Sequence, residues 1–299
     1  MSELINIIVN WLNSIMNSEL TNDRIYILNN SYEPLYEKED ILNRLYQLIW
    51  ITYRKNFEEI NNYTNDIGWG CMIRTTQMLV GEGLIRESNK SNITKLFKDD
   101  INSELSIHNM LINNDIGKWY GPTETSYMIS RCLNKLDYNT YIESSGILYK
   151  SEIRIDKPLF IFIILRLGLD NIDENFKESL LRCFEIESCI GIIGGKPSSS
   201  YYFYGYQNDN LLYLDPHIVQ ESKSPEYKCE IINLLNYKKL DPSLCVGFFI
   251  KNEKELNNFY ENISKVINLE YSIFNIKENK VNYNINFKKQ DDWEFIVSK

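Results

Sequence analysis

A short, continuous apolar run, PLFIFIIL at residues 158–165, constrains the fold more than any other feature of the chain. Its residues are mostly β-branched or aromatic, which is typical of a strand that is buried on both faces. It is also the longest apolar run in the chain, whereas a helix that spans a bilayer needs about 20 apolar residues. The run therefore predicts a buried strand of a packed domain, and we expect no segment to cross a membrane.

Helical patterns come mostly early in the chain and strand patterns mostly late. Helices are expected over residues 40–53, with Asp40 in the capping position, from about 71 to 81 or 83, over 123–136 and over 172–186. Further strands are expected over residues 201–206 and 211–215, which form a hairpin around the turn QNDN, and over 244–250. This order predicts an α+β fold in which a mostly antiparallel sheet packs against helices.

The chain is predicted to form one domain followed by a tail. No internal repeat and no Pro/Gly-rich linker divides residues 1–266. The Asn/Lys-rich residues 267–299 lose this periodicity, and we expect a loosely ordered tail there. Residues 1–16, MSELINIIVNWLNSIM, lack the positive start and the cleavage site of a signal peptide. We therefore expect an amphipathic helix at the start and a cytoplasmic location.

Charge and cysteine usage argue against several functional classes. A formal net charge of -9 makes nucleic acid an unexpected partner, since binding it requires a basic surface. The six cysteines form no Cys-x-x-Cys pair, and the chain has only two histidines. These counts favour free thiols over a disulfide framework or a zinc site. We expect no metal and no cofactor.

One cysteine stands in a context that suits a reactive thiol. Cys71 lies in DIGWGCMIRTTQM, residues 66–78, where the expected helix begins. The free amide groups and partial positive charge of a helix N-terminus favour a thiolate and can also bind a developing oxyanion. The alternative is a small buried hydrophobe, which is the interpretation we give to the other five cysteines.

A candidate base lies in the sequence LLYLDPHIVQ. If the strand continues, Asp215 and His217 share one face, so the carboxylate can orient the imidazole while the other ring nitrogen faces a thiol. Pro216 marks the end of the strand. The alternative is a turn that carries a surface histidine. His108 has no acid two residues away, so we interpret it as a cap or core residue.

Several long blocks of the chain, in one order, carry a family resemblance. These blocks are YRKNFEEI, DIGWGCMIRTTQMLVGEGL, GKWYGP, LRLGLD, GIIGGKPSSSYYFYGYQNDNLLYLDPHIVQ and LDPSLCVGFFI. They resemble the autophagins, the autophagy-related cysteine proteases, from about Tyr26 to Ile250. The resemblance implies a papain-like cysteine protease fold.

The resemblance also implies roles for individual residues. Cys71 matches the nucleophile of the family, and Asp215 and His217 match its acid and its base. Tyr53 matches a tyrosine whose hydroxyl joins the Cys71 amide in the oxyanion hole; its alternative role is a core aromatic residue. Trp119 matches a tryptophan over the groove that enters the active site.

The segment GGKPSSS matches a mobile loop that blocks the site until substrate displaces it. Within it the lid is assigned to Lys196, Pro197, Ser198 and Ser199. A phosphate-binding loop is a poor alternative, because Pro197 follows the lysine where a Walker motif has Ser or Thr.

The substrate implied by the resemblance is a ubiquitin-like autophagy modifier that is cut after a glycine near its C-terminus. The enzyme would process the precursor and release the modifier from phosphatidylethanolamine. Its membrane contact would be transient and would come through the lipidated substrate. We expect a monomer.

The end of the chain carries a candidate modifier-binding motif, DDWEFIV. Trp293 and Ile296 follow an aromatic-x-x-aliphatic pattern that could add to a sheet edge and fill two pockets. The alternative is a last strand packed on the domain.

Other functional classes stay open at this stage. The chain could be a protease of another ubiquitin-like modifier, or an acyltransferase that uses the same three residue types. It could also be a noncatalytic modifier-binding protein. Such a protein would tolerate loss of Cys71, Asp215 or His217, so the presence of all three residues argues against this class.

Overall fold

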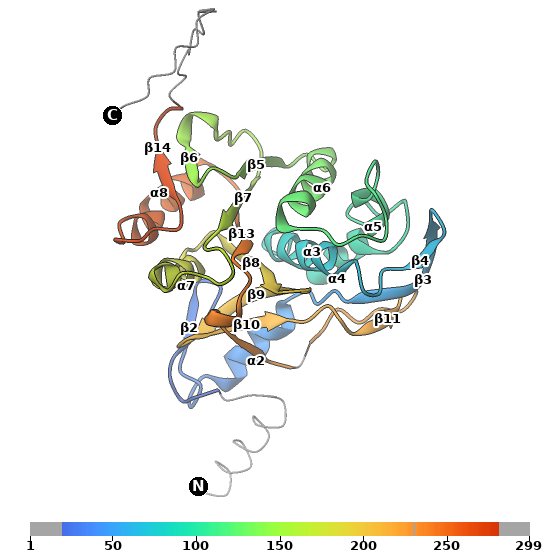
Figure 1. The fold of residues 1–299 in the computed structure, drawn as a ribbon, viewed down its shortest axis with the longest axis horizontal. Coiled ribbons are helices and arrows are strands. Elements are labelled where there is room, and N and C mark those ends of the chain that lie inside the picture. Colours follow the sequence, from blue (N-terminus) through green and yellow to red (C-terminus); the bar gives the residue numbers. More distant parts are fainter. Residues whose placement is uncertain (1–19, 230, 281–299) are drawn as a thin grey trace, which may run out of the picture.

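The computed structural model describes residues 20–229 and 231–280. Within them a nine-stranded sheet forms the centre of the molecule (Figure 1). Its path runs through β12 (Asn233–Asn236), β10 (Asn210–Leu214), β9 (Ser199–Gln207), β8 (Cys189–Lys196), β13 (Ser243–Ile250), β7 (Leu159–Arg166) and β5 (Asn139–Glu143), while β1 (Ile25–Ile27) pairs with β9 and with β2 (Asn30–Tyr32). Only β5 and β7 pair in parallel in this sheet. The expected α+β fold with a mostly antiparallel sheet is confirmed.

The apolar run that predicted a buried strand is β7, which lies between β13 and β5. Seven of its eight residues are buried, and only Arg166 at its end is exposed. Its register with β13 extends from Leu159 opposite Ile250 to Arg166 opposite Ser243. The strand is therefore covered on both faces, as its unbroken apolar character predicts.

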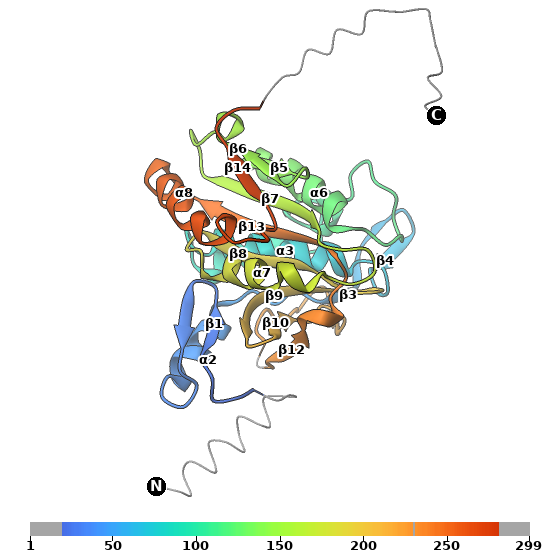
Figure 2. The same ribbon diagram turned by 60° about the vertical axis from the view of Figure 1, so that its left-hand side comes forward.

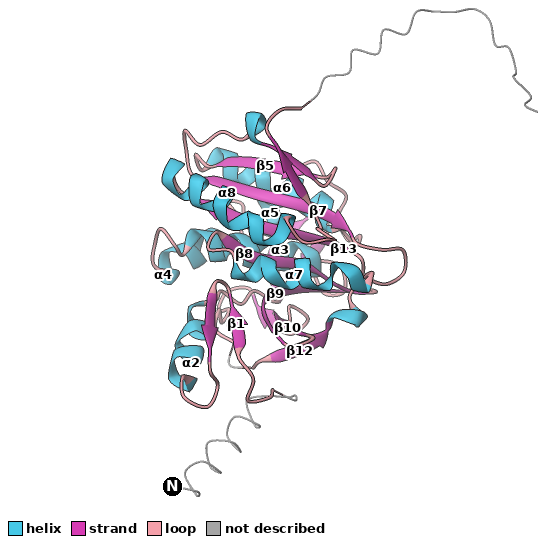
Figure 3. Ribbon diagram, turned by 90° about the vertical axis from the view of Figure 1, so that its left-hand side faces the viewer, coloured by secondary structure: helices cyan, strands magenta, loops and turns pink. Residues whose placement is uncertain are grey.

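Helices cover both faces of the sheet. Figure 3 shows α7 (Lys177–Arg182) and α8 (Glu253–Ile267) on one face, and α3 (Cys71–Leu84), α5 (Ile107–Met110) and α6 (Pro122–Lys135) on the other. All residues of α3 are buried, because it lies between the sheet and α6. The short helix α4 (Lys90–Ile93) follows α3. None of the helices in residues 20–280 that the structure describes is long and apolar enough to cross a membrane.

Two helices differ from their predicted bounds. The first, α2, spans Lys38–Gln47 rather than 40–53, with Glu37 as its N-cap in place of Asp40. It ends early because Trp50 is held in extended chain: its backbone N–H donates to the Tyr227 carbonyl at 3.1 Å, and its indole Nε1 donates to the Asp215 carbonyl at 2.8 Å. The helix expected over 172–186 is shortened to α7, with 3-10 turns at Glu174–Phe176 and Cys183–Glu185.

A smaller sheet lies beside the expected hairpin. The hairpin itself is formed by β9 and β10, close to the predicted bounds. The smaller sheet contains β11 (Val219–Glu221), β3 (Tyr53–Ile60) and β4 (Tyr63–Asn65), and β11 and β3 pair in parallel with Val219 opposite Tyr53. This pairing brings the segment after β10 alongside the start of β3.

Part of the predicted tail packs on the domain. After α8, β14 (Asn275–Lys277) pairs in parallel with β6 (Ile147–Tyr149), and Figure 2 shows the two strands side by side. Ile273 and Phe274 are buried because they are apolar and reach the core. Residues 268–280 thus differ from the loosely ordered tail that we expected after 266. Residues 1–16, Trp293 and Ile296 lie outside the described residues.

Candidate active site

Cys71 is the first residue of α3, as the sequence predicted. Gly70 is the N-cap residue, and its N–H donates to the Asp66 carbonyl at 2.9 Å, so the turn before the helix folds back tightly. A Cβ atom on Gly70 would lie 2.5 Å from Oδ2 of Asp66, so this position requires glycine. Gly68 has φ +82°, a left-handed conformation that glycine adopts without strain. The two glycines of GWGC therefore shape the turn that presents the cysteine.

A buried group of charged side chains holds this turn against β3. Oδ2 of Asp66 accepts a hydrogen bond from Arg74 Nε at 2.7 Å, and Oδ1 accepts one from the Arg54 backbone N–H at 2.6 Å. Arg74 also donates through Nη1 to Asp99 Oδ1 at 2.7 Å, and Arg54 Nε lies 3.7 Å from Asp99 Oδ2. Asp66 thus ties the first turn of α3 to the strand that begins with Tyr53.

The acid and the histidine lie immediately after β10, where the chain leaves the sheet. Oδ1 of Asp215 accepts hydrogen bonds from His217 Nδ1 at 2.6 Å and from the His217 backbone N–H at 2.9 Å. The carbonyl of Pro216 accepts from the Tyr53 N–H at 2.7 Å. With the Trp50 bond to the Asp215 carbonyl, this contact holds Asp215 and Pro216 against residues 50–53, where β3 begins.

The imidazole of His217 is held between two tyrosines. Its ring makes edge contacts with Tyr53, at 5.4 Å between centroids, and with Tyr201, at 5.6 Å. Within the described residues its Nε2 atom is buried and makes no hydrogen bond of ordinary geometry. One nitrogen is therefore committed to Asp215, and the other stays available for proton transfer.

The protonation states of the pair follow from burial and from these contacts. Burial would raise the pKa of the Cys71 thiol, but interactions with His217, Ser200 and Tyr53 outweigh it and the pKa is lowered. Burial would lower the pKa of His217, but Asp215 and Cys71 raise it to about 9. Burial opposes the ionised form of Asp215 as well, yet its bonds to His217 lower its pKa. The lowered pKa of Cys71 and the raised pKa of His217 both favour the thiolate–imidazolium form of the pair over its neutral form.

Tyr53 is a buried core residue whose hydroxyl lies near the Cys71 sulfur. The side chain is 5% exposed. Burial, and then the negative charge that Cys71 can carry, raise the pKa of Tyr53. Its hydroxyl therefore keeps its proton and can act as a hydrogen-bond donor beside the sulfur.

Trp119 and three of the four predicted lid residues border the same pocket as Cys71, whereas Pro197 does not line it. The pocket has a volume of about 200 Å³, and its lining includes Cys71, Trp119, Lys196, Ser198 and Ser199. Trp119 is 63% exposed, and its Nε1 donates to the Gly68 carbonyl at 2.5 Å. The predicted lid forms the tight turn between β8 and β9, in which Lys196 is paired with Ser199 and Ser198 has φ +67°. We call residues 196–199 the lid turn.

Three contacts of the site were missed by sequence reasoning. Ser200 lies with its Oγ 3.4 Å from Cys71 Sγ, Tyr201 contacts the His217 ring, and Trp50 holds the Asp215 carbonyl. No pattern in the sequence distinguishes Ser200 from Ser198 and Ser199. The rival histidine, His108, is buried, and its Nε2 lies 2.7 Å from the Glu58 carbonyl.

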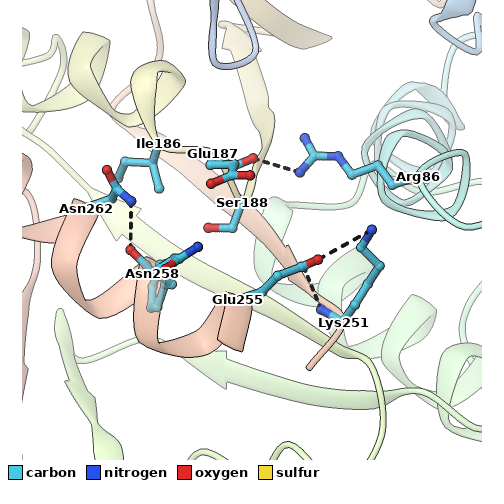
Figure 4. Close-up of a pocket in the computed structure, with 9 residues that line it drawn as sticks. Arg86, Ile186, Glu187, Ser188, Lys251, Glu255, Asn258 and Asn262 are labelled. Carbon is cyan, nitrogen blue, oxygen red and sulfur yellow. Dashed lines mark hydrogen bonds and ion pairs between the residues drawn. The ribbon is translucent and has the colours of Figure 1, made fainter. Parts of the chain in front are cut away.

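Another pocket lies near the opposite end of α3 and is chemically different (Figure 4). Arg86 donates through Nη1 to the Glu187 carbonyl at 2.9 Å, and Lys251 Nζ lies 3.4 Å from Glu255. Among the described residues, no cysteine or histidine lines this pocket. Among the residues that the structure describes, no cluster of His, Cys, Asp and Glu could hold a metal ion.

A buried cysteine at a helix N-terminus, beside an Asp-His pair that favours its thiolate, is the arrangement of a cysteine hydrolase. A family model described as the Peptidase C54 catalytic domain matches residues 38–262. The chain belongs to this family and is a cysteine protease.

Individual relatives agree with the family. "Probable cysteine protease atg4" of Schizosaccharomyces pombe is 33% identical over 269 residues, which cover 82% of this chain and 84% of that protein. "Cysteine protease ATG4B" of Gallus gallus is 29% identical over 321 residues, which cover 82% of this chain and 81% of that protein. The resemblance to the autophagins is confirmed. Among solved structures, "Crystal structure of UfSP from C.elegans" covers 80% of this chain and 36% of that chain with 14% identity and a TM-score of 0.39, which is too distant to inform the fold or the function.

Proposed function

We propose that this cysteine protease cleaves after the C-terminal glycine of a ubiquitin-like autophagy modifier, with Cys71 as nucleophile, His217 as proton carrier and Asp215 as the group that orients the histidine. The observation that carries the proposal is the Asp215–His217 hydrogen bond of 2.6 Å next to a buried thiol with a lowered pKa. The relatives named ATG4 support the modifier as the substrate.

The reaction begins with attack of the Cys71 thiolate on the carbonyl of the glycine. The Cys71 amide, at the helix N-terminus, and the Tyr53 hydroxyl stabilise the oxyanion. His217 then gives its Nε2 proton to the leaving amine, and a thioester to Cys71 remains. Water hydrolyses the thioester with His217 as general base. No metal or cofactor takes part.

Selectivity for glycine follows from the walls of the site. Trp119 and the lid turn border the pocket over Cys71, which has a volume of about 200 Å³. A residue without a side chain enters such a narrow passage with the least steric cost. Substrate entry displaces the lid turn, and Trp119 forms the roof of the groove.

The same chemistry serves two substrates, the unprocessed precursor and the modifier linked to phosphatidylethanolamine. The enzyme acts as a cytoplasmic monomer and meets membranes transiently through the lipidated substrate. Trp293 and Ile296 bind a further copy of the modifier by adding an extended segment to its sheet edge.

The test is cleavage of a purified precursor modifier with a C-terminal extension, by the wild-type chain and by Cys71→Ala. We expect a product that ends at the glycine with the wild-type chain alone. A ubiquitin-based substrate run in parallel should stay uncut; its cleavage would favour a protease of another ubiquitin-like modifier. Binding of the modifier by both chains without cleavage by either would instead favour a noncatalytic binding protein.

A further inference from the structure

The sulfur of Cys71 contacts a hydroxyl from the strand that follows the lid turn. Sγ of Cys71 and Oγ of Ser200 are 3.4 Å apart, which is within hydrogen-bonding range for sulfur. Cys71 and Ser200 are each 8% exposed, so water competes little for either atom. Within the described residues, the Ser200 hydroxyl makes no other hydrogen bond. This contact joins α3 to β9 at the reacting atom itself.

The charge of the sulfur decides the direction of this hydrogen bond. A thiolate can only accept, whereas a hydroxyl can rotate its proton toward any neighbouring acceptor. We propose that the Ser200 hydroxyl donates a hydrogen bond to the Cys71 thiolate and is a catalytic residue that holds the resting nucleophile in its ionised form. The proposal rests on the proposed function in taking Cys71 as the nucleophile, and its response to substrate entry rests on displacement of the lid turn.

The position of Ser200 is tied to the lid turn. Ser199, next to it in β9, is paired with Lys196, and Ser200 is paired with Gly195. The strands approach so closely here that a Cβ atom on Gly195 would lie 1.8 Å from the Ser199 carbonyl oxygen. Displacement of the lid turn would therefore draw the donor away from the sulfur. A thiolate that loses a hydrogen bond becomes the stronger nucleophile, so the bond stabilises the resting state and weakens as substrate enters.

Other groups near the sulfur set the background for a pH measurement. His217 faces it from the segment after β10, and Tyr53 faces it from β3. Asp215 acts on the sulfur through its hydrogen bond to His217, and Lys196 acts through its charge next to Asp215. Asp66 acts through its effect on Tyr53. All of these groups are unchanged in a Ser200 variant, so a difference from the wild-type chain reports the hydroxyl.

The experiment is alkylation of the full-length chain by iodoacetamide as a function of pH, with modification of the Cys71 peptide followed by mass spectrometry. We expect Ser200→Ala to move the midpoint upward by roughly 1 pH unit, since a hydrogen bond to a charged group is lost. Ser200→Thr retains the hydroxyl and should restore most of the shift. Ser188→Ala removes a buried hydroxyl from the pocket near the opposite end of α3, so its midpoint should equal that of the wild-type chain.

The outcomes separate this inference from the proposed function, because alkylation requires no substrate. If the wild-type chain and Ser200→Ala share one midpoint that lies below that of a free thiol, the role of Ser200 is overturned and the proposed function is not affected. A wild-type midpoint near that of a free thiol, about 8.5, would instead contradict Cys71 as an activated nucleophile. If Ser200→Ala does not fold, as judged by circular dichroism, Ser200→Val compared with Ser200→Thr supplies the test, because the two side chains have the same shape and only Thr carries the hydroxyl.

Discussion

At the residue scale, catalysis depends on how the Asp215 carboxylate holds His217. One carboxylate oxygen, Oδ1, accepts from both the ring and the backbone of His217. This double contact fixes the tautomer and the orientation of the imidazole, because Nδ1 must carry the proton that it donates. Nε2 is then the atom that exchanges a proton with sulfur or with the leaving group.

Asp215→Asn tests this assignment. The amide preserves the shape of the side chain but can donate to Nδ1, which selects the wrong tautomer. We expect kcat/KM for precursor cleavage to fall by at least about 100-fold with little change in thermal stability. The measurement is steady-state cleavage together with a melting curve. Activity within a factor of three of the wild-type chain would contradict the orienting role.

The pH dependence of cleavage follows from the opposite shifts of Cys71 and His217. Because the pKa of Cys71 is lowered, the thiolate forms at a lower pH than in a free thiol, and the rising limb of the pH–rate profile moves to lower pH. The imidazolium persists until its pKa of about 9, above which the proton for the leaving group is lost. We therefore expect kcat/KM to follow a bell-shaped curve with a falling limb near pH 9. A falling limb near the unperturbed histidine value of about 6.5 would show that the pair is not coupled in this way.

At the scale of elements, the position of α3 against the sheet determines where Cys71 lies. Near the C-terminal end of the helix, Gly83 allows the backbone to approach β7 and β13 closely. A Cβ atom at Gly83 would lie 2.5 Å from Phe160 Cε1 and 3.2 Å from Phe249 Cβ. The helix and the sheet thus meet at a position where a side chain does not fit.

Gly83→Val should destabilise the fold by about 1–3 kcal/mol, because the added side chain overpacks a core of aromatic rings. Urea unfolding followed by circular dichroism measures the change. Gly121→Ala is the matched control: its Cβ would meet no atom within 4 Å, and we expect a change below about 1 kcal/mol. Equal effects of the two substitutions would contradict the packing argument.

At the scale of the whole molecule, a buried group of charges connects the start of β3, the turn before α3, the first turn of α3 and the loop at Asp99. Arg74 is 0% exposed, and its guanidinium lies between the carboxylates of Asp66 and Asp99, each at 2.7 Å. Removing the cation would leave two buried carboxylates without their main partner. The resulting decrease in the free energy of unfolding exceeds the contribution of a surface ion pair, because the remaining carboxylates stay desolvated.

Arg74→Met should therefore lower the free energy of unfolding by roughly 3–5 kcal/mol. The matched control is Arg182→Met, which removes an exposed ion pair with Glu178 at 2.8 Å and should change stability by at most about 0.5 kcal/mol. Both are measured by denaturant unfolding. A small effect of Arg74→Met would mean that water or relaxation compensates the carboxylates, and that the group is not needed to hold the turn before Cys71.

Features that depend on neighbours along the chain could be predicted from the sequence. The unbroken apolar run became β7, the residues after GWG became the helix that starts at Cys71, and Asp215 and His217 met because they are two residues apart. Features that join distant segments could be seen only once the chain was folded. Trp50 ended α2 early by bonding to Asp215, and Ser200 reached Cys71 from 129 residues away. Local pattern carries no information on such contacts, because they form only when the sheet and helices pack together.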